Sequence, residues 1–400
     1  MKKRSADHSR PSRARPPHVA VIVETSTSFG RRVVRGISRF ARGQGPWSIY
    51  VEQRSIFDPP PPWLKRWHGD GIICNRATPE VDRAVRTTGV PVVDLGEPTN
   101  DEGAVQVLNN DAAIGRLAAE HLLGAGFRRL GFVGHAGVYW SDDRMGGFER
   151  AALTAGATCE VFHPSGPRRR RFNQPPWEEE LGAMIAWLKE LQKPVGLMAA
   201  SDFRAVQVLD AARQARVAVP EEASVIGVDD EEVVREAARP SLSTVVPGAE
   251  QIGYLAAETL AGMMTGKRPE VQQRRVDPVG IVTRQSTSVL AIEDPFVAAA
   301  MKYIRENACL GIKGGDVLER VGMSRTGLQR HFMECTGRGI HEHIATARVE
   351  VIKDLLARTD LSLPAIAERV GVNHASYLST LFKKHTGMTL SDYRDEHQRP

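Results

Sequence analysis

The sequence contains no apolar stretch long enough to cross a membrane. None approaches the roughly 20 consecutive apolar residues that a membrane-spanning helix needs. The basic N-terminus, MKKRSADHSRPSRARPP, leads into an apolar stretch of only residues 19–23, which is too short for a secretory signal. We therefore expect a cytoplasmic protein with no membrane partner.

Cysteine is also scarce. The four cysteines, Cys74, Cys159, Cys309 and Cys335, are far apart, and no Cys-x-x-Cys pair occurs. This spacing is typical neither of a disulfide framework nor of a set of metal ligands. We expect reduced structural thiols, with no metal site and no cofactor.

Positive charge is concentrated at the two ends of the chain. Residues 1–17 carry six Lys and Arg against one Asp, and residues 295–400 carry fifteen against twelve Asp and Glu, in a chain of net charge +5. The residues between them have a net charge of −3. Basic ends favour a polyanionic partner such as nucleic acid. A solvated, disordered leader at residues 1–17 would have the same composition.

The 400 residues suffice for two or three domains. Up to residue 291, continuous β-branched runs alternate with helical stretches, which is typical of parallel strands buried on both faces in a doubly wound α/β fold. The alternation is too long for one modest sheet and favours two lobes. The expected strands are HVAVIVE, WSIYVE, DGIICN, VPVVDLG, RLGFVGH, VGLMAASD and SVIGVDD, and the expected helices cover residues 29–42, 112–123, 143–155, 178–191 and 203–213.

Candidate ligand-binding residues lie where these strands end. Ligands of open α/β sheets bind at the carboxyl ends of the strands. Carboxylates there accept sugar hydroxyl groups, an arginine donates several hydrogen bonds, and an aromatic ring packs against C–H surface. Asp111 opens a helix, so it is either a cap or a ligand contact, whereas Asp230 is expected to face solvent. The candidates are Phe29, Arg31, Asp111, Trp140, Asp202 and Asp229.

From residue 292 onward the strand patterns cease, and a helical pattern occurs twice. The sequence ERVG ends a short helix at residues 319–322 and again at residues 368–371, and each glycine supplies a left-handed helix end. In the helix that follows, Leu328 and Phe332, or Leu378 and Phe382, are spaced four apart and share one buried face. The pattern predicts helix-turn-helix units at about 313–335 and 362–386, joined by a long helix. The second copy is one residue longer, which suggests a longer or differently phased second helix.

The outward faces of the two second helices carry residues suited to DNA. In helix-turn-helix proteins this helix presents its N-terminal residues to the major groove. An all-helical dimerisation module with exposed charges is the alternative for a single unit, and the second unit favours DNA. The candidates are Ser324, Arg325, Thr326, Gln329, Arg330, Asn373, His374, Ser376, Ser379, Thr380 and Lys383.

An enzyme is the main alternative from another class. GMMTGKRP departs from a phosphate-binding loop because its glycines are too close and no Ser or Thr follows the lysine. GAGFRRLG lies at a helix-to-strand junction, which is the wrong context for dinucleotide binding, and no Gly-x-Ser-x-Gly occurs. A periplasmic sugar carrier would need a signal peptide and would have no use for the helical tail.

The tail resembles an AraC-type DNA-binding domain in GMSRTGLQRHF, AIAERVGV and LFKKHTGMTLSDYR, with Leu378 in place of the usual Phe and Leu390 in place of the usual Pro. The body resembles the LacI/GalR regulators and their periplasmic sugar-binding relatives in NNDAAIGRLAAEHLLGAGFRRLGFVG, GLMAASDFRAVQVL and ASVIGVDD. The second resemblance implies that Arg144, together with Asp202 and Asp229, binds the ligand.

The combination of a LacI-like sensor and an AraC-type head resembles sugar-responsive transcription activators. It implies a leader at residues 1–17, a two-lobed sensor at 18–291 and a DNA-binding domain at 292–400. It further implies D-xylose, another pentose or another plant-cell-wall sugar as the effector. The expected partners are double-stranded operator DNA with repeated half-sites, RNA polymerase, and a second copy of the chain in a homodimer.

Overall fold

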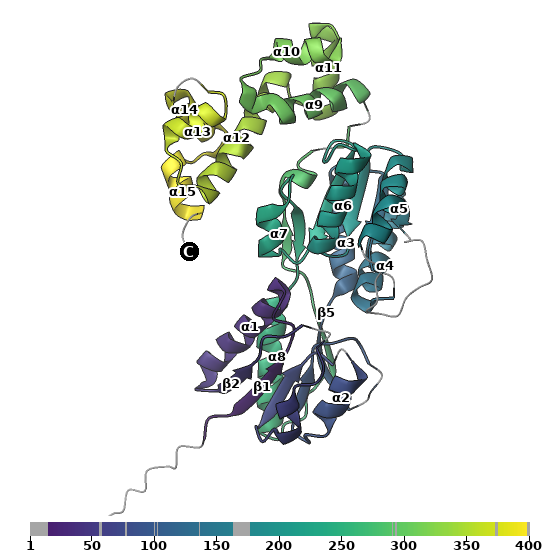
Figure 1. The fold of residues 1–400 in the computed structure, drawn as a ribbon, viewed down its shortest axis with the longest axis vertical. Coiled ribbons are helices and arrows are strands. Elements are labelled where there is room, and N and C mark those ends of the chain that lie inside the picture. Colours follow the sequence, from purple (N-terminus) through teal and green to yellow (C-terminus); the bar gives the residue numbers. More distant parts are fainter. Residues whose placement is uncertain are drawn as a thin grey trace, which may run out of the picture.

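The computed structural model describes residues 15–55, 58–76, 78–99, 101, 103–135, 137–162, 177–289, 291–292, 294–372 and 375–397. These residues form an N-terminal lobe, a C-terminal lobe and a helical domain, which follow one another along the long axis of the molecule (Figure 1). The expected fold, a two-lobed α/β body followed by an all-α domain, is confirmed. No helix among the described residues is long and apolar enough to cross a membrane.

The N-terminal lobe contains a parallel sheet of strand order β11-β5-β4-β3-β1-β2. Buried Val, Ile and Ala side chains of β1 and β3 form its centre because both faces of these strands are covered. Its elements are β1 His18–Ile22, α1 Ser28–Gln44, β2 Ser48–Val51, the 3-10 helix η1 Pro62–Arg66, β3 Gly71–Cys74, α2 Pro79–Arg86, β4 Val92–Asp94, β5 Val105–Asn109, α8 Ala249–Met264 and β11 Gln273–Val276.

The C-terminal lobe contains a second sheet, of order β12-β10-β9-β8-β6-β7, in which only β12 is antiparallel to its neighbour among the described strands. Its elements are α3 Asp111–Gly124, β6 Arg129–Val133, α4 Tyr139–Thr154, β7 Thr158–Phe162, α5 Trp177–Glu190, β8 Val195–Ala199, α6 Asp202–Ala215, β9 Ala223–Val228, α7 Glu232–Ala237, β10 Ser243–Val246, β12 Gly280–Val282 and η2 Gln285–Thr287.

Three crossings of the chain join the two lobes in the described structure. They follow β5, β10 and β11, at residues 110, 247–248 and 277–279. Each crossing leaves from the carboxyl end of a strand, so the carboxyl ends of both sheets face the boundary between the lobes. That boundary is where ligands of open α/β sheets bind.

The sequence-based strand predictions were incomplete and in one case wrong. All seven expected strands exist, but β5, β7, β10, β11 and β12 were not predicted. WSIYVE was expected to be buried on both faces. It forms β2 at the edge of the sheet, where Tyr50 and Val51 are 41% and 42% exposed.

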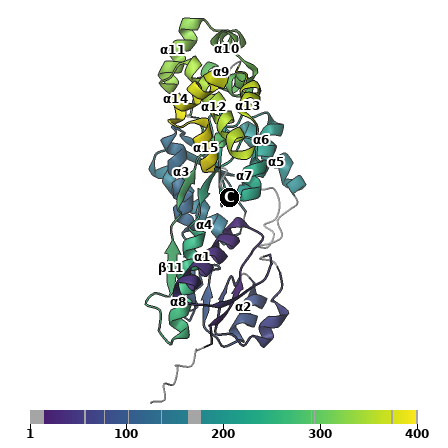
Figure 2. The same cartoon turned by 90° about the vertical axis from the view of Figure 1, so that its left-hand side faces the viewer.

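The helical domain has two cores that share one long helix. Its elements are α9 Pro295–Asn307, η3 Ala308–Leu310, α10 Gly314–Val321, α11 Arg325–Thr336, α12 Ile340–Arg358, α13 Leu363–Arg369, α14 Ala375–Thr386 and α15 Leu390–His397. Leu328 and Phe332 lie in one core, and Leu378 and Phe382 lie in the other, all fully buried. The first half of α12 packs on the first core and the second half on the other. Figure 2 shows the helices of this domain gathered at one end of the molecule.

The turns between the helices of each unit contain the predicted left-handed glycines. Gly322 and Gly371 have φ angles of 72° and 67°. The prediction of a longer second helix is not confirmed, because α11 and α14 both have 12 residues as described. The extra residue lies between Gly371 and Ala375.

Candidate functional sites

A cavity of about 390 Å³ lies between the lobes and is lined from both sides. Its volume falls in the range of small-molecule sites, roughly 300–1,000 Å³. Of the residues predicted to bind a ligand, the cavity brings together Phe29 of the N-terminal lobe with Asp111, Trp140, Arg144 and Asp229 of the C-terminal lobe. Polar groups and aromatic rings therefore converge where the sequence predicted them.

Arg144 is held rigidly at the wall of this cavity. Its Nε donates a hydrogen bond to Oδ1 of Asp111 at 2.8 Å, and its Nη1 donates to the carbonyl oxygen of Ala200 at 2.5 Å. The guanidinium carbon lies 4.8 Å from the centroid of the Trp140 ring, a cation–π distance. The sequence left open whether Asp111 caps α3. Asn110 is the cap, since its side chain accepts from the amide of Ala113, which leaves the Asp111 carboxylate to Arg144.

Burial disfavours the ionised form of two of the cavity carboxylates, Asp111 and Asp229. Burial raises the pKa of Asp111, although Arg144 opposes the shift. Burial also raises the pKa of Asp229 to about 6, again against the effect of Arg144. A bound molecule that donates hydrogen bonds would stabilise the ionised form of either group. This environment suits a polyhydroxylated ligand.

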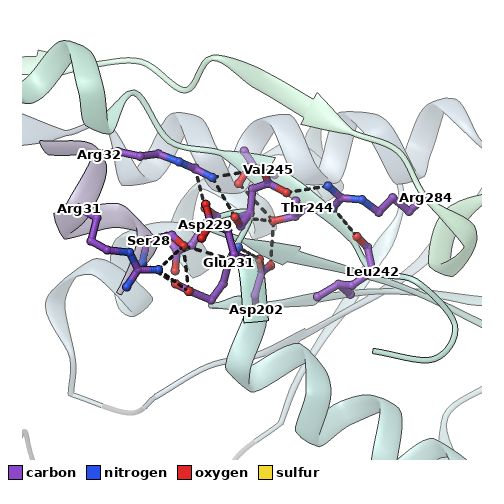
Figure 3. Close-up of polar contacts among 12 residues, drawn as sticks. Ser28, Arg31, Arg32, Asp202, Asp229, Glu231, Leu242, Thr244, Val245 and Arg284 are labelled. Atoms are coloured by element: carbon purple, nitrogen blue, oxygen red, sulfur yellow. Dashed lines mark hydrogen bonds and ion pairs between the residues drawn. The ribbon is translucent and has the colours of Figure 1, made fainter. Parts of the chain in front are cut away.

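Two predicted ligand residues, Asp202 and Arg31, are not among the residues that line the cavity. The Asp202 carboxylate is occupied, because Oδ2 accepts from the amide of Glu231 and Oδ1 accepts from Oγ1 of Thr244, both at 2.8 Å. Arg31 reaches across the lobe boundary instead, and its Nη2 donates to Oε1 of Glu231 at 3.1 Å (Figure 3). Both residues support the segment that follows β9 and do not face the cavity.

Asp230 was expected to face solvent, and this was wrong. Its carboxylate is 14% exposed and lies between two arginines. Oδ1 accepts from Nη2 of Arg284 at 2.7 Å, and Oδ2 accepts from Nη2 of Arg32 at 3.2 Å. These ion pairs could not be predicted from the sequence because neither arginine is near Asp230 in the chain.

Several polar cavity residues were missed by the sequence analysis. Each lies at or just beyond the carboxyl end of a strand. The rule that found Asp229 would have found all of them except Asn109, whose strand β5 was not predicted. The Oδ1 atom of Asn109 is buried without a hydrogen-bond partner in the described structure. Burial lowers the pKa of His135 to about 4, which keeps its ring neutral. The missed residues are Asn75, Glu97, Asn109, His135 and Ser201.

No cluster of His, Cys, Asp and Glu that could hold a metal ion occurs in the described part of the chain. In the sequence HEH of α12, His343 is partly buried, and its Nε2 pairs with Oγ1 of Thr336. The structure therefore provides no metal-ligand set at that motif.

The predicted DNA-binding residues that the structure describes are all exposed on α11 and α14 or at their starts. Ser324 caps α11, with Oγ accepting from the amide of Gly327 at 3.2 Å. Arg330 is 69% exposed and is held only by a 3.8 Å contact with Glu334, which is weak at this exposure. Asn373 and His374 lie outside the described residues. The remaining exposed candidates are Arg325, Thr326, Gln329, Ser376, Ser379, Thr380 and Lys383.

The face of α14 also carries an aromatic residue that the sequence analysis did not select. Tyr377 is 53% exposed beside Ser376, whereas its neighbour Leu378 is fully buried. The sequence analysis selected the neighbouring polar residues of this face, such as Ser376 and Ser379, and did not include Tyr377.

Comparisons with known proteins agree with this arrangement. Residues 18–107 match the XylR N-terminal domain, residues 119–287 match the periplasmic binding protein-like domain, and residues 317–396 match a helix-turn-helix domain. The chain is 30% identical to the xylose operon regulatory protein of Escherichia coli strain K12 over 94% of this chain and 96% of that protein. The identity to the protein of the same description from Haemophilus influenzae is 30%, over 94% and 97%.

One solved structure matches nearly the whole chain. It is described as the structure of xylose-binding transcription activator xylR, and it superposes with a TM-score of 0.79 at 29% identity, covering 96% of this chain and 99% of that chain. The match extends through both lobes and the helical domain.

Proposed function

The chain belongs to the family of the xylose operon regulatory proteins, and we propose that it is a D-xylose-dependent activator of genes for xylose use. Its relatives are transcription regulators and not enzymes. The observation that carries the proposal is the presence, in one chain, of a polar interlobe cavity and two helix-turn-helix units. One part would sense a sugar and the other would read DNA.

In this proposal Asp111, Asp229 and Arg144 bind the hydroxyl groups and the ring oxygen of the sugar. Ionised carboxylates accept two or more hydroxyl hydrogen bonds, and a guanidinium donates several. Trp140 and Phe29 provide the apolar wall against the C–H faces of the sugar. Asp202 and Arg31 act indirectly, through the segment that follows β9.

The DNA part of the proposal assigns base and phosphate contacts to α11 and α14. α12 passes through both cores, so it sets the separation between the two helices. We propose that a homodimer binds repeated half-sites of double-stranded operator DNA and recruits RNA polymerase. The protein would act in the cytoplasm, and on the nucleoid when bound to DNA.

Coupling between the two parts requires that the sugar bind one arrangement of the lobes better than another. The sugar would bridge the lobes, and lobe closure would change how the two DNA-binding domains of a dimer are presented. The C-terminal lobe contacts the helical domain through Arg305 of α9, whose Nε and Nη2 donate to the buried Glu221 carboxylate at 2.7 and 3.0 Å.

Isothermal titration calorimetry with D-xylose, D-ribose, L-arabinose and D-glucose tests the sugar assignment. We expect D-xylose to bind most tightly. Tighter binding of another pentose or of another plant-cell-wall sugar would favour the alternative, a regulator of the same architecture with a different effector. Absence of binding by any pentose, with no effect on DNA affinity, would overturn the proposal.

A further inference from the structure

Three consecutive residues after β9 serve three different parts of the molecule. Asp229 lines the cavity, and Asp230 pairs with Arg32 and Arg284. The side chain of Glu231 reaches Ser28 at the start of α1 (Figure 3). Asp229 and Asp230 have φ angles of 110° and 50°, which non-glycine residues rarely adopt. Such a conformation persists only where the surroundings enforce it, and it is common at functional sites.

Glu231 joins the two lobes through a buried carboxylate. It belongs to the C-terminal lobe and is 2% exposed. Its Oε2 accepts from the amide of Ser28 at 2.6 Å, and its Oε1 accepts from Oγ of Ser28 at 2.8 Å and from Nη2 of Arg31 at 3.1 Å. Ser28 is the first residue of α1, where backbone amides lack partners within the helix and the helix dipole favours a negative charge. The C-terminal lobe therefore supplies a negative charge that stabilises the N-terminus of α1 in the N-terminal lobe.

These hydrogen bonds exist only while the lobes are closed at this edge. Ser28 and Glu231 are separated by some 200 residues of chain, and they meet through lobe packing. Arg32 adds to the same contact by donating to the carbonyl oxygens of Asp229 and Asp230, both at 2.8 Å. When the lobes open, water must replace all of these partners. The balance between open and closed states therefore depends on this contact.

A second contact between the lobes is more exposed. Arg275 of β11 donates to the Tyr139 hydroxyl at 3.0 Å and to Oδ2 of Asp143 at 3.3 Å, and its side chain is 36% exposed. Exposed ion pairs of this kind contribute little. Of the two contacts, the one centred on Glu231 is the better candidate to control closure.

We propose that Glu231 is a positioning residue that sets the affinity for the sugar without touching it, by stabilising the closed lobes. This rests on the proposed function, since it concerns the same cavity. The Asp202 carboxylate accepts a hydrogen bond from the backbone amide of Glu231 and so fixes its position. Asp229, which lines the cavity, lies two residues before Glu231 in the chain. A sugar bound to Asp229 therefore also restrains Glu231. By reciprocity, loss of the Glu231 contact must weaken sugar binding.

The test compares Glu231→Gln with Glu232→Gln in the full-length protein. Glu232 is the adjacent residue and is exposed, so its substitution is a matched control. Calorimetry with D-xylose should give a dissociation constant about tenfold higher for Glu231→Gln. The value for Glu232→Gln should lie within about twofold of the wild type. Small-angle scattering should show a less compact sugar-free form for Glu231→Gln only, with wild-type compaction at saturating sugar.

If Glu231→Gln fails to fold, Arg31→Ala is tested in its place. Arg31 is partly exposed, and its substitution removes only one of the hydrogen-bond donors to the Glu231 carboxylate. It should raise the dissociation constant about threefold. Unchanged affinity in a folded Glu231→Gln or Arg31→Ala protein, when the wild type binds D-xylose, overturns this inference alone. A wild type that binds no sugar overturns the proposed function, and this inference with it.

Discussion

Nε of Arg144 lies 2.8 Å from Oδ1 of Asp111 in the cavity between the lobes, and both side chains are only 5% exposed. A buried pair of this kind makes removal of one partner costly, because the other is left charged or must take up a proton. The same two side chains are our candidates for sugar binding, so stability and ligand affinity are linked at this point.

Arg144→Ala should therefore lower the free energy of unfolding by about 3–5 kcal/mol and remove detectable sugar binding. Urea denaturation and calorimetry measure the two effects. Arg150→Ala is the matched control, because Arg150 lies on the same helix and is exposed. A normal unfolding free energy for Arg144→Ala would contradict the importance of the pair.

Asp229 predicts a pH dependence of stability. Burial raises its pKa to about 6. A carboxyl group whose folded pKa exceeds its unfolded value, about 3.9, makes the folded state less stable as it ionises. The wild type should therefore lose stability relative to Asp229→Asn as the pH rises from about 4 to 6, and the difference should stay level above that range. Thermal unfolding of both proteins at several pH values measures this difference in stability. A difference that does not change with pH would contradict the buried position of Asp229.

The raised pKa of Asp229 also predicts that the affinity for the sugar falls in mild acid. The ionised carboxylate accepts hydroxyl hydrogen bonds better than the protonated acid does. Below about pH 6 the wild type should bind D-xylose more weakly, whereas Asp229→Asn should bind weakly at every pH. Calorimetry at pH 5 and pH 7.5 compares the D-xylose affinities of the two proteins. Equal wild-type affinity at both values would exclude Asp229 as a contact to the sugar.

Arg330→Ala tests the first DNA-reading helix. Its side chain is 69% exposed and its only described ion pair is long, so the substitution should leave stability unchanged. Operator affinity should fall by about 1–3 kcal/mol, and a phosphate contact would also reduce the salt dependence by about one unit of slope. Arg320→Ala, on the exposed surface of α10, is the control. Unchanged operator binding and salt dependence would mean that α11 is not the reading helix.

Arg305→Ala tests communication between the sensor and the helical domain. Its two hydrogen bonds to Glu221, which is 2% exposed, tie α9 to the C-terminal lobe. The variant should bind D-xylose normally but respond to it with a smaller change in DNA affinity. Glu306→Ala, at the next and exposed position, should respond as the wild type does. A full sugar response in Arg305→Ala would show that coupling follows another route.

The sequence predicted the features that depend on local chemistry. Strand ends located Asp229, and helix-ending glycines with buried residues four apart located both helix-turn-helix units. These patterns are short-range consequences of backbone geometry and of helix periodicity. They are therefore readable in a single sequence.

The features that depend on how the lobes meet could not be predicted in this way. Asp202 and Asp229 both follow the end of a strand, yet only Asp229 lines the cavity, because the Asp202 carboxylate is occupied by Glu231 and Thr244. Asp230 had no visible partner because Arg32 and Arg284 reach it from distant parts of the chain. WSIYVE was misjudged because an edge strand and a central strand can share the same apolar composition.

In the proposed mechanism, binding of D-xylose changes how tightly this chain binds DNA. Fluorescence anisotropy of a labelled promoter fragment, titrated with the full-length protein with and without saturating D-xylose, measures it directly. We predict that D-xylose tightens operator binding by about tenfold, within the usual range of coupling between two sites. If D-xylose binds the protein and operator affinity stays the same, the account of a sugar-dependent activator is contradicted.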